Sequence, residues 1–181
     1  MVNIPDHGTM FGIVADYAYE ATKCNKTILI MVTYLKDGYR IEKALKGVLH
    51  NHQVRFVSGR HSKWDRRQAL DDLTNTGNPL KVLIATKIFE KGIDIPELDI
   101  AINMKLERSD IGTIQSLGRT LRGIKEKIML DFFLENNDTS ISKSRRREDC
   151  YKAVENFKYE RLGIGEFIDA YQNQQWTIPD G

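Results

Sequence analysis

The chain has 181 residues, of which 41% are hydrophobic and 29% are charged, an ordinary composition for a globular domain with one core. No apolar run approaches the roughly 20 residues that a membrane span needs, and the N-terminus lacks the basic-then-apolar pattern of a signal peptide. The net charge is only +2, so any contact with nucleic acid must come from a local basic patch.

The N-terminal part of the chain predicts an arm followed by a helix and a strand–helix unit. Residues 1–8 are expected to form a linker or arm, because Pro5 and Gly8 interrupt any regular pattern. Apolar periodicity then predicts, in order, a helix over 9–23, a buried strand over 27–33 and an amphipathic helix over 35–49. Thr33 and Tyr34 lie where this strand ends, and open parallel sheets bind ligands at the carboxyl ends of their strands. An ordinary strand–helix unit explains the same pattern.

A second strand–helix unit follows, with a strand over 54–58 and a helix over 63–73. Ser62 is the predicted N-cap of this helix, with Asp65 three residues later as the second half of a capping box. Arg66 lies in the first turns, where a cation opposes the helix dipole. A solvated basic turn accounts for this arginine equally well.

Two short apolar runs mark the centre of the sequence. Residues 82–86 and 98–103 each predict a strand buried on both faces, as in a parallel sheet. Between them, residues 92–96 read Gly-Ile-Asp-Ile-Pro and predict a turn.

The next predicted helix carries two arginines. Gln115, Arg119 and Arg122 fall at i, i+4 and i+7, so they form one stripe that is separate from the apolar stripe of the helix. Gly118 in the helix interior costs about 1 kcal/mol relative to alanine, which a close approach would offset. Two guanidiniums and a carboxamide on one rigid support favour the binding of an anion such as phosphate.

The stretch from residue 81 to residue 122 resembles motifs V and VI of a superfamily 2 helicase, in the second of its RecA-like domains. Residues 85–96 resemble motif V. Residues 115–122, Gln-Ser-Leu-Gly-Arg-Thr-Leu-Arg, resemble motif VI, commonly Gln-Arg-x-Gly-Arg-x-x-Arg. Ser116 stands where many members carry arginine, which puts one phosphate or interdomain contact in doubt. The resemblance implies a three-layer α/β domain of RecA type, with a mostly parallel central sheet, over residues 9–134.

The resemblance also implies catalytic and nucleotide-binding roles. Arg119 and Arg122, with Gln115, would be the catalytic residues, and the two arginines would act on the charge that develops on the γ-phosphate of ATP. Gly92 would let the chain approach a ligand closely, and Asp94 would lie near the ribose of the nucleotide or pair with motif VI.

Nucleic-acid contacts are implied in the same way. Thr86 resembles the motif V threonine that meets a backbone phosphate. Thr33 and Tyr34 resemble the end of motif IV, which faces nucleic acid. Arg66 lies seven residues after Gly59, as in helicases of this class, and would help to hold the nucleic-acid face.

The C-terminal part predicts a last strand over 127–133, a polar loop over 134–144 and a helix that opens at Ser144. Asp131 is expected to be a capping or turn carboxylate. Seven cations and four anions lie between residues 143 and 161. Such an excess attracts phosphates, although a solvated helix start is the usual explanation of a basic run.

We assign the arginines of this basic run, Arg145, Arg146 and Arg147, to nucleic-acid binding. Beyond Gly163, a final helix with apolar residues at i, i+3, i+4 and i+7 is expected to pack back on the domain. Residues 143–181 would thus form a helical C-terminal extension. This layout is similar to the tail of phage recombination-repair helicases of the UvsW type.

Two motifs of a complete helicase are absent from the sequence. There is no G-x-x-x-x-G-K-[ST] phosphate loop and no Asp-Glu pair, so the first RecA-like domain is missing. ATP and Mg²⁺ would be bound mainly by that domain, and the chain alone is predicted to hydrolyse no ATP. The linker-like start favours a C-terminal half separated from its first domain.

The predicted function is therefore that of the C-terminal half of an ATP-dependent DNA helicase or translocase in the cytoplasm, or in the host cytoplasm if the chain is encoded by a phage. Its expected partners are the N-terminal RecA-like domain and single-stranded or branched DNA, with RNA as an alternative and no membrane. A standalone, non-catalytic module that binds nucleic acid or protein is the competing hypothesis.

Cys24 and Cys150 predict reduced, buried thiols, and His50 and His52 lack the further ligands that a metal site needs.

Overall fold

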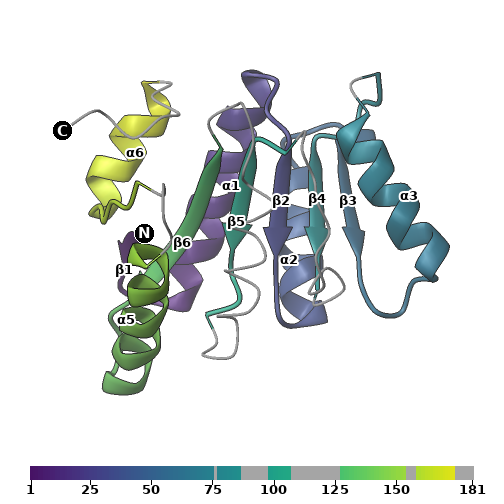
Figure 1. The fold of residues 1–181 in the computed structure, drawn as a ribbon. Coiled ribbons are helices and arrows are strands. Elements are labelled where there is room, and N and C mark those ends of the chain that lie inside the picture. Colours follow the sequence, from purple (N-terminus) through teal and green to yellow (C-terminus); the bar gives the residue numbers. More distant parts are fainter. Residues whose placement is uncertain (76, 87–97, 107–126, 154–157, 174–181) are drawn as a thin grey trace.

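The computed structural model describes residues 1–75, 77–86, 98–106, 127–153 and 158–173. The strands in this part of the chain form one sheet in the order β1-β6-β5-β2-β4-β3, and every neighbouring pair is parallel (Figure 1). The strands are β1 (Val2–Ile4), β2 (Ile28–Met31), β3 (Val54–Val57), β4 (Val82–Ala85), β5 (Ile100–Asn103) and β6 (Ile128–Leu134). The described helices are α1 (His7–Lys23), α2 (Leu35–Lys46), the 3₁₀ turn η1 (Asn51–Gln53), α3 (Lys63–Thr74), α5 (Asp138–Lys152) and α6 (Ile164–Gln172).

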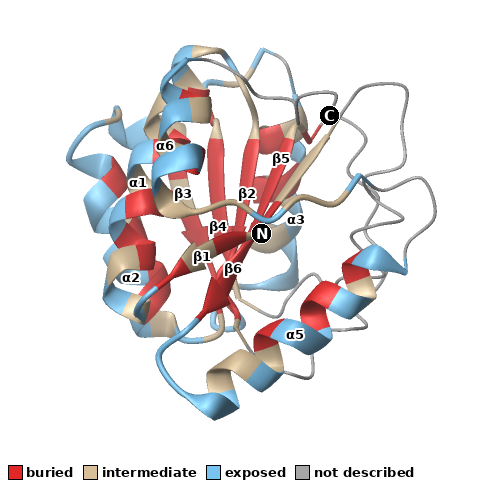
Figure 2. Ribbon diagram, turned by 90° about the vertical axis from the view of Figure 1, so that its left-hand side faces the viewer, coloured by how far each residue is buried: buried red, intermediate tan, exposed pale blue. Residues whose placement is uncertain are grey.

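Helices cover both faces of the sheet. One hydrophobic cluster joins the strands to α1, α2 and α6, and a second joins the opposite face to α3. Strands β2, β4 and β5 are therefore buried along their whole length, as the red ribbons of Figure 2 show. An all-apolar strand is stable only where both of its faces are covered. The three-layer α/β fold with a mostly parallel sheet is thus confirmed.

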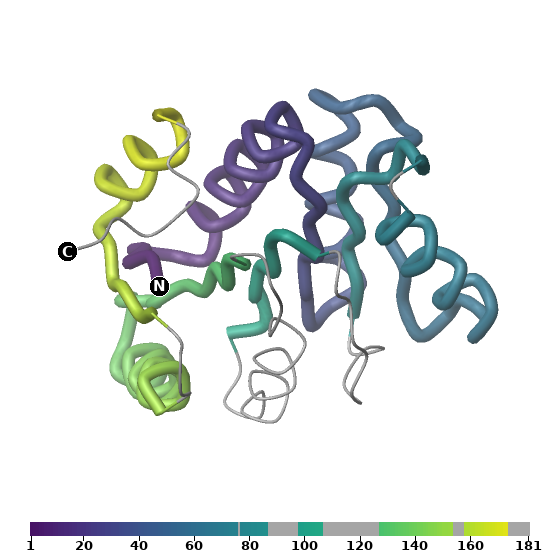
Figure 3. The backbone as a smooth tube through the Cα atoms, turned by 45° about the horizontal axis from the view of Figure 1, so that its top comes forward, coloured from purple at the N-terminus to yellow at the C-terminus, as the bar shows by residue number. Residues whose placement is uncertain are grey.

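Helix α6 packs against α1 on one side of the sheet, whereas α5 lies on the other side with α3 (Figure 3). The ring of Tyr17 on α1 lies 5.1 Å from the ring of Phe167 and 5.6 Å from the ring of Tyr171. The expected packing of the final helix against the domain is confirmed.

The N-terminal segment differs from the prediction. Residues 1–8 were expected to form a linker or arm, but β1 pairs with β6 and α1 already begins at His7. Val2 and Ile4 are 1% and 0% exposed, so alternate side chains of this short strand enter the core. Pro5 has no backbone N–H to donate, and the strand ends directly before it.

The segment predicted as a loop over 134–144 is also different. Strand β6 continues to Leu134, and α5 begins at Asp138 rather than at Ser144. The side chain of Asn137 caps α5 by accepting a 2.9 Å hydrogen bond from the N–H of Ser140. Asn, Asp and Ser favour loops and helix N-caps for the same reason, because their side chains bond to nearby backbone groups.

The two cysteines differ from the prediction in their burial. Both carry free thiols, but each is only partly buried, whereas buried thiols were expected. Among the described residues, no helix combines the length and the apolar character that would let it cross a membrane.

Candidate functional site

The carboxyl ends of the strands meet at one edge of the sheet. The strand register aligns Asp131, Asn103, Met31, Ala85 and Val57 across β6, β5, β2, β4 and β3. The residues that follow these five therefore form a row along the edge where parallel sheets bind their ligands.

Two of the predicted nucleic-acid residues lie in this row. Thr33 follows β2, and its Oγ1 donates to the carbonyl oxygen of Lys105 at 3.3 Å. Thr86 follows the adjacent strand β4, and its backbone N–H donates to the carbonyl oxygen of Val57 at 3.3 Å. The two threonines thus follow neighbouring strands of the sheet.

Tyr34 is the exposed aromatic residue at the end of β2. It is 56% exposed, and the Nζ of Lys36 lies 5.5 Å from the centre of its ring. Tyr34 is also the N-cap residue of α2, although its side chain makes no capping hydrogen bond. An aromatic face beside a cation is a suitable platform for a nucleobase.

Arg66 contributes by holding the turn between β3 and α3. Its Nη1 donates to the carbonyl oxygen of His61 at 2.7 Å, and Nδ1 of His61 accepts from the N–H of Ser58 at 3.0 Å. The predicted capping box is present, because Ser62 Oγ accepts from the N–H of Asp65 at 3.0 Å and the carboxylate of Asp65 accepts in return. Arg66 therefore supports the edge by fixing a turn of the backbone.

Trp64 is a feature of this edge that the sequence analysis missed. It lies in the first turn of α3 and is 70% exposed, which is a large apolar surface for a single side chain. The buried Leu73 lies nine positions later in the helix, and at 3.6 residues per turn this is two and a half turns. The apolar stripe of α3 thus already indicated that Trp64 points away from the core.

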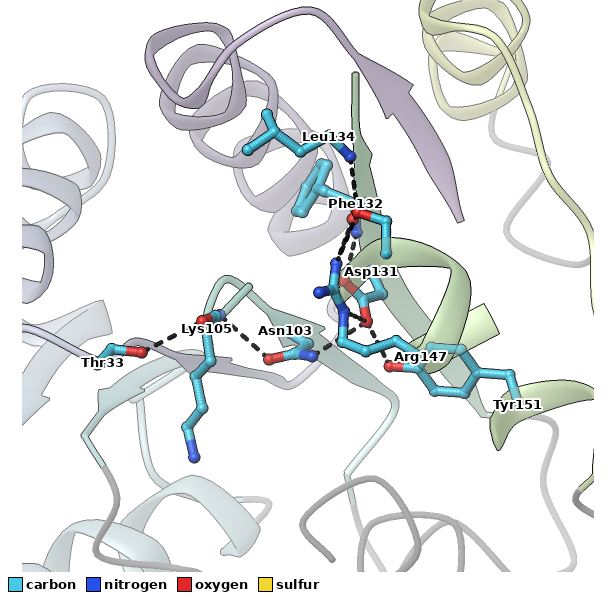
Figure 4. A network of polar contacts seen from close by, with 9 residues as sticks. Thr33, Asn103, Lys105, Asp131, Phe132, Leu134, Arg147 and Tyr151 are labelled. Carbon is cyan, nitrogen blue, oxygen red and sulfur yellow. Dashed lines mark hydrogen bonds and ion pairs between the residues drawn. The ribbon is translucent and has the colours of Figure 1, made fainter. Parts of the chain in front are cut away.

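The prediction that Arg147 binds nucleic acid is wrong. Its side chain is 1% exposed and forms an ion pair with Asp131 on β6, with 3.0 Å between Nε and Oδ2. Its Nη2 also donates to the carbonyl oxygen of Phe132 at 2.7 Å. Figure 4 shows this guanidinium enclosed between α5 and β6. A buried arginine needs such partners, because an unpaired charge in the interior is strongly unfavourable.

Asp131 is the centre of this buried polar network and not a turn carboxylate. Besides Arg147, its Oδ2 accepts from Tyr151 Oη at 2.6 Å and from Asn103 Nδ2 at 3.1 Å (Figure 4). Burial raises the pKa of Tyr151 well above its ordinary value, and the neighbouring charge of Asp131 raises it further. The phenol therefore stays protonated and serves as a donor to the carboxylate.

The other two arginines of the basic run are exposed. Arg145 and Arg146 lie on the solvent side of α5, and Lys143 is half-buried one turn before Arg147. Only a part of the run is therefore available to an external anion.

Several predicted residues lie outside the described part of the chain. They are the catalytic candidates Gln115, Arg119 and Arg122, the nucleotide candidates Gly92 and Asp94, and the divergent Ser116. Within the described residues, no three His, Cys, Asp or Glu side chains gather in a way that could hold a metal ion.

Comparison with known sequences identifies one family. The profile described as "Helicase conserved C-terminal domain" matches residues 12–123. The chain is 30% identical over 137 residues to the probable ATP-dependent RNA helicase ddx49 of Dictyostelium discoideum, covering 72% of this chain and 26% of that protein. It is 27% identical over 153 residues to the pre-mRNA-splicing ATP-dependent RNA helicase PRP28 of Saccharomyces cerevisiae, covering 84% of this chain and 24% of that protein. The chain thus spans about a quarter of the length of these relatives.

Solved structures share the fold. The S. cerevisiae protein Dbp5 bound to RNA and ADP BeF3 matches with a TM-score of 0.71 at 17% identity, covering 96% of this chain and 43% of that chain. The separate C-terminal domain of Dbp5 matches with a TM-score of 0.71 at 19% identity, covering 97% and 95%. T4 UvsW matches with a TM-score of 0.66 at 18% identity, covering 87% and 35%. At these identities the likeness shows the fold alone.

Proposed function

The chain belongs to the helicase conserved C-terminal domain family, as a RecA-like domain of superfamily 2, and we propose that it is the half of an ATP-dependent helicase that holds the nucleic-acid strand. The observation that carries this proposal is the row of groups at the carboxyl edge. Thr33 and Thr86 supply hydroxyl groups just after neighbouring strands, while Tyr34 at the N-cap of α2 and Trp64 in the first turn of α3 present exposed rings. Aromatic platforms with nearby cations are typical of sites that bind single strands.

The names of the relatives support RNA as the substrate. The two relatives described above are named as ATP-dependent RNA helicases, whereas T4 UvsW, which the phage expectation had in view, shares the fold at 18% identity. We therefore propose single-stranded RNA as the substrate and keep DNA as the comparison in the test below.

ATP and Mg²⁺ do not fit this chain by itself. The sequence contains no phosphate loop and no Asp-Glu pair, and the described residues hold no carboxylate cluster for a metal. Both would be held by a partner domain. The contribution proposed for this chain is the pair Arg119 and Arg122, which would supply positive charge to the nucleotide.

Fluorescence anisotropy with labelled single-stranded RNA and DNA of one sequence tests the strand-binding proposal. We expect binding that weakens as salt rises, with RNA bound more tightly than DNA. Replacing Tyr34 or Trp64 by alanine should weaken binding by about 1–3 kcal/mol for each stacked base that is lost.

Tyr19→Ala is the matched control. Tyr19 lies near the C-terminal end of α1, and the Nζ of Lys23 lies 4.3 Å from the centre of its ring, much as Lys36 lies near Tyr34. Binding should not change in this variant. Absence of binding at low salt, or equal binding by the parent, Tyr34→Ala and Trp64→Ala proteins, would contradict the proposal. Tighter binding of DNA would restore the original substrate expectation.

A non-catalytic module, the competing hypothesis, would bind nucleic acid at the same edge of the sheet. The two hypotheses differ in ATPase activity, because a non-catalytic module gains none when a helicase first domain is supplied. Adding such a domain to the chain therefore separates the two hypotheses.

A further inference from the structure

A cavity of about 210 Å³ lies at the same edge of the sheet, between the ends of β2, β5 and β6 and the first turns of α5. Its walls include Thr33 and Lys105 from the sheet, and Ser140, Lys143 and Ser144 from α5. The match to the helicase family ends at residue 123. The α5 wall of this cavity is therefore contributed by a part of the chain beyond the family match.

Two buried residues have hydrogen-bond donors to spare: Ser144, which lines this cavity, and Arg147, whose guanidinium contacts Ser144. Ser144 is 1% exposed, and its Oγ accepts from the N–H of Leu134 at 3.1 Å and from Arg147 Nη2 at 3.5 Å. Both bonds use the lone pairs of Ser144, so its O–H can still donate. The Nη1 of Arg147 is also buried and has no hydrogen-bond partner among the described residues. In Figure 4 it points to the side on which Thr33 and Lys105 lie.

Buried donors of this kind are stabilised by a hydrogen-bond acceptor. Nearly all buried polar groups in folded proteins are hydrogen-bonded, because an unsatisfied buried donor is unfavourable. The Ser144 hydroxyl on the cavity wall, with the Arg147 guanidinium 3.5 Å from its Oγ, favours a ligand that brings oxygen acceptors without hydrogens. A phosphate group is such a ligand.

The charges around the cavity agree with this chemistry. Among the described residues that line it are two lysines, Lys105 and Lys143, and one carboxylate, Asp37. Asp37 is in the first turn of α2, where the positive end of that helix dipole favours its carboxylate. The first turn of α5 supplies the same kind of positive end beside Ser140. A phosphodiester carries a single negative charge, which the ammonium of Lys143 on the cavity wall would attract.

We propose that this cavity is a phosphate-binding subsite for the nucleic-acid strand, formed by Lys143, Ser140 and Ser144 on α5 beside Thr33. This inference rests on the proposed function, because it places one backbone phosphate of the same strand. The subsite extends the strand path from the end of β2 across β5 to β6 and α5.

The test compares salt dependence in the complete chain and its variants. Binding of single-stranded RNA is measured by anisotropy at several salt concentrations for the parent, Lys143→Ala and the double variant Lys143→Ala with Ser140→Ala. Loss of one phosphate contact should reduce the slope of log K against log salt by about 0.7. Lys143→Ala should also weaken binding roughly tenfold at low salt, as expected for one charged hydrogen bond.

Lys26→Ala is the control for a general loss of positive charge. Lys26 is also half-buried, but it lies two residues before β2 and therefore at the opposite, amino edge of the sheet. Its substitution should leave both slope and affinity unchanged. Circular dichroism of every variant checks that the fold is retained.

The outcomes separate the two proposals. If the parent binds RNA and Lys143→Ala binds it equally well with the same slope, the subsite is refuted and strand binding stands. If the parent binds no RNA, both proposals fail. Titration with inorganic phosphate, followed by calorimetry, tests a free anion as the ligand. A phosphate affinity that depends on Lys143, combined with RNA binding that does not, would overturn the strand subsite.

Discussion

At the scale of single residues, three consecutive arginines have different environments. Arg145 and Arg146 are exposed, while Arg147 is enclosed against β6. Ser144, Arg147 and Tyr151 recur at i, i+3 and i+7, which is the spacing of a buried helical stripe. The stripe is polar because β6 presents Asp131 to it. A search for apolar periodicity does not detect such a stripe.

Replacing Asp131 by asparagine should destabilise the fold by about 3–5 kcal/mol, because it leaves the charge of Arg147 buried without its counter-ion. Chemical denaturation, followed by circular dichroism, measures this free energy of unfolding. An exposed pair provides the control. Arg67 and Asp71 on α3 are 72% and 52% exposed and lie 3.0 Å apart, so Asp71→Asn should cost about 0–1 kcal/mol.

A double variant tests whether the effect comes from the pair itself. Asp131→Leu combined with Arg147→Met removes both charges and should cost less than the sum of the two single changes, since no lone charge stays buried. Additive costs would show that the two side chains act independently, which contradicts the proposed coupling.

At the scale of elements, α2 approaches β3 very closely at a glycine. A Cβ added to Gly38 would lie 2.3 Å from Cε2 and Cζ of Phe56. The ring of Phe56 is held in turn by Tyr39, with their ring centroids 5.0 Å apart in an edge-to-face arrangement. Gly38 therefore sets the distance between this helix and the sheet, and with it the position of Tyr34 at the start of α2.

Gly38→Ala should destabilise the protein by about 1–3 kcal/mol, because overpacking outweighs the gain of about 1 kcal/mol that alanine brings to a helix. Thermal denaturation compares it with Gly165→Ala in α6. Nothing lies within 4 Å of a Cβ at Gly165, so that change should be neutral or stabilising by up to about 1 kcal/mol. Equal effects of the two changes would disprove the close-approach argument.

At the scale of the whole molecule, the proposed function makes this chain the second of the two RecA-like domains of a helicase. It spans 26% and 24% of the two relatives described above. Its described residues form one sheet with both faces covered, so the fold has a core of its own. The sequence contains no G-x-x-x-x-G-K-[ST] phosphate loop and no Asp-Glu pair.

The purified chain is therefore expected to hydrolyse no ATP, with or without RNA. A phosphate-release assay measures this rate, and a helicase first domain added to the same assay serves as the reference. Hydrolysis by the chain alone that disappears in Arg119→Ala would overturn the expectation and place a complete catalytic site in this half.

Much of the fold was predictable because its signals are local. Apolar runs such as 28–31 and 82–85 are buried strands, and the capping box of Ser62 and Asp65 starts α3 at the expected residue. The order of motifs along the sequence was sufficient to identify the family. Buried strands, helix caps and motif spacing depend on residues that are close in sequence, so these features can be predicted from the sequence alone.

Only the tertiary structure decided which polar residues face solvent and which face one another. Residues 2–4 are a strand because β6 offers them an edge, and Arg147 is buried because Asp131 lies across from it. The cavity beside Lys143 belongs to the same class. Each depends on groups that are distant in sequence or on the direction of a side chain relative to the core, and this information arises only when the sheet and its helices pack together.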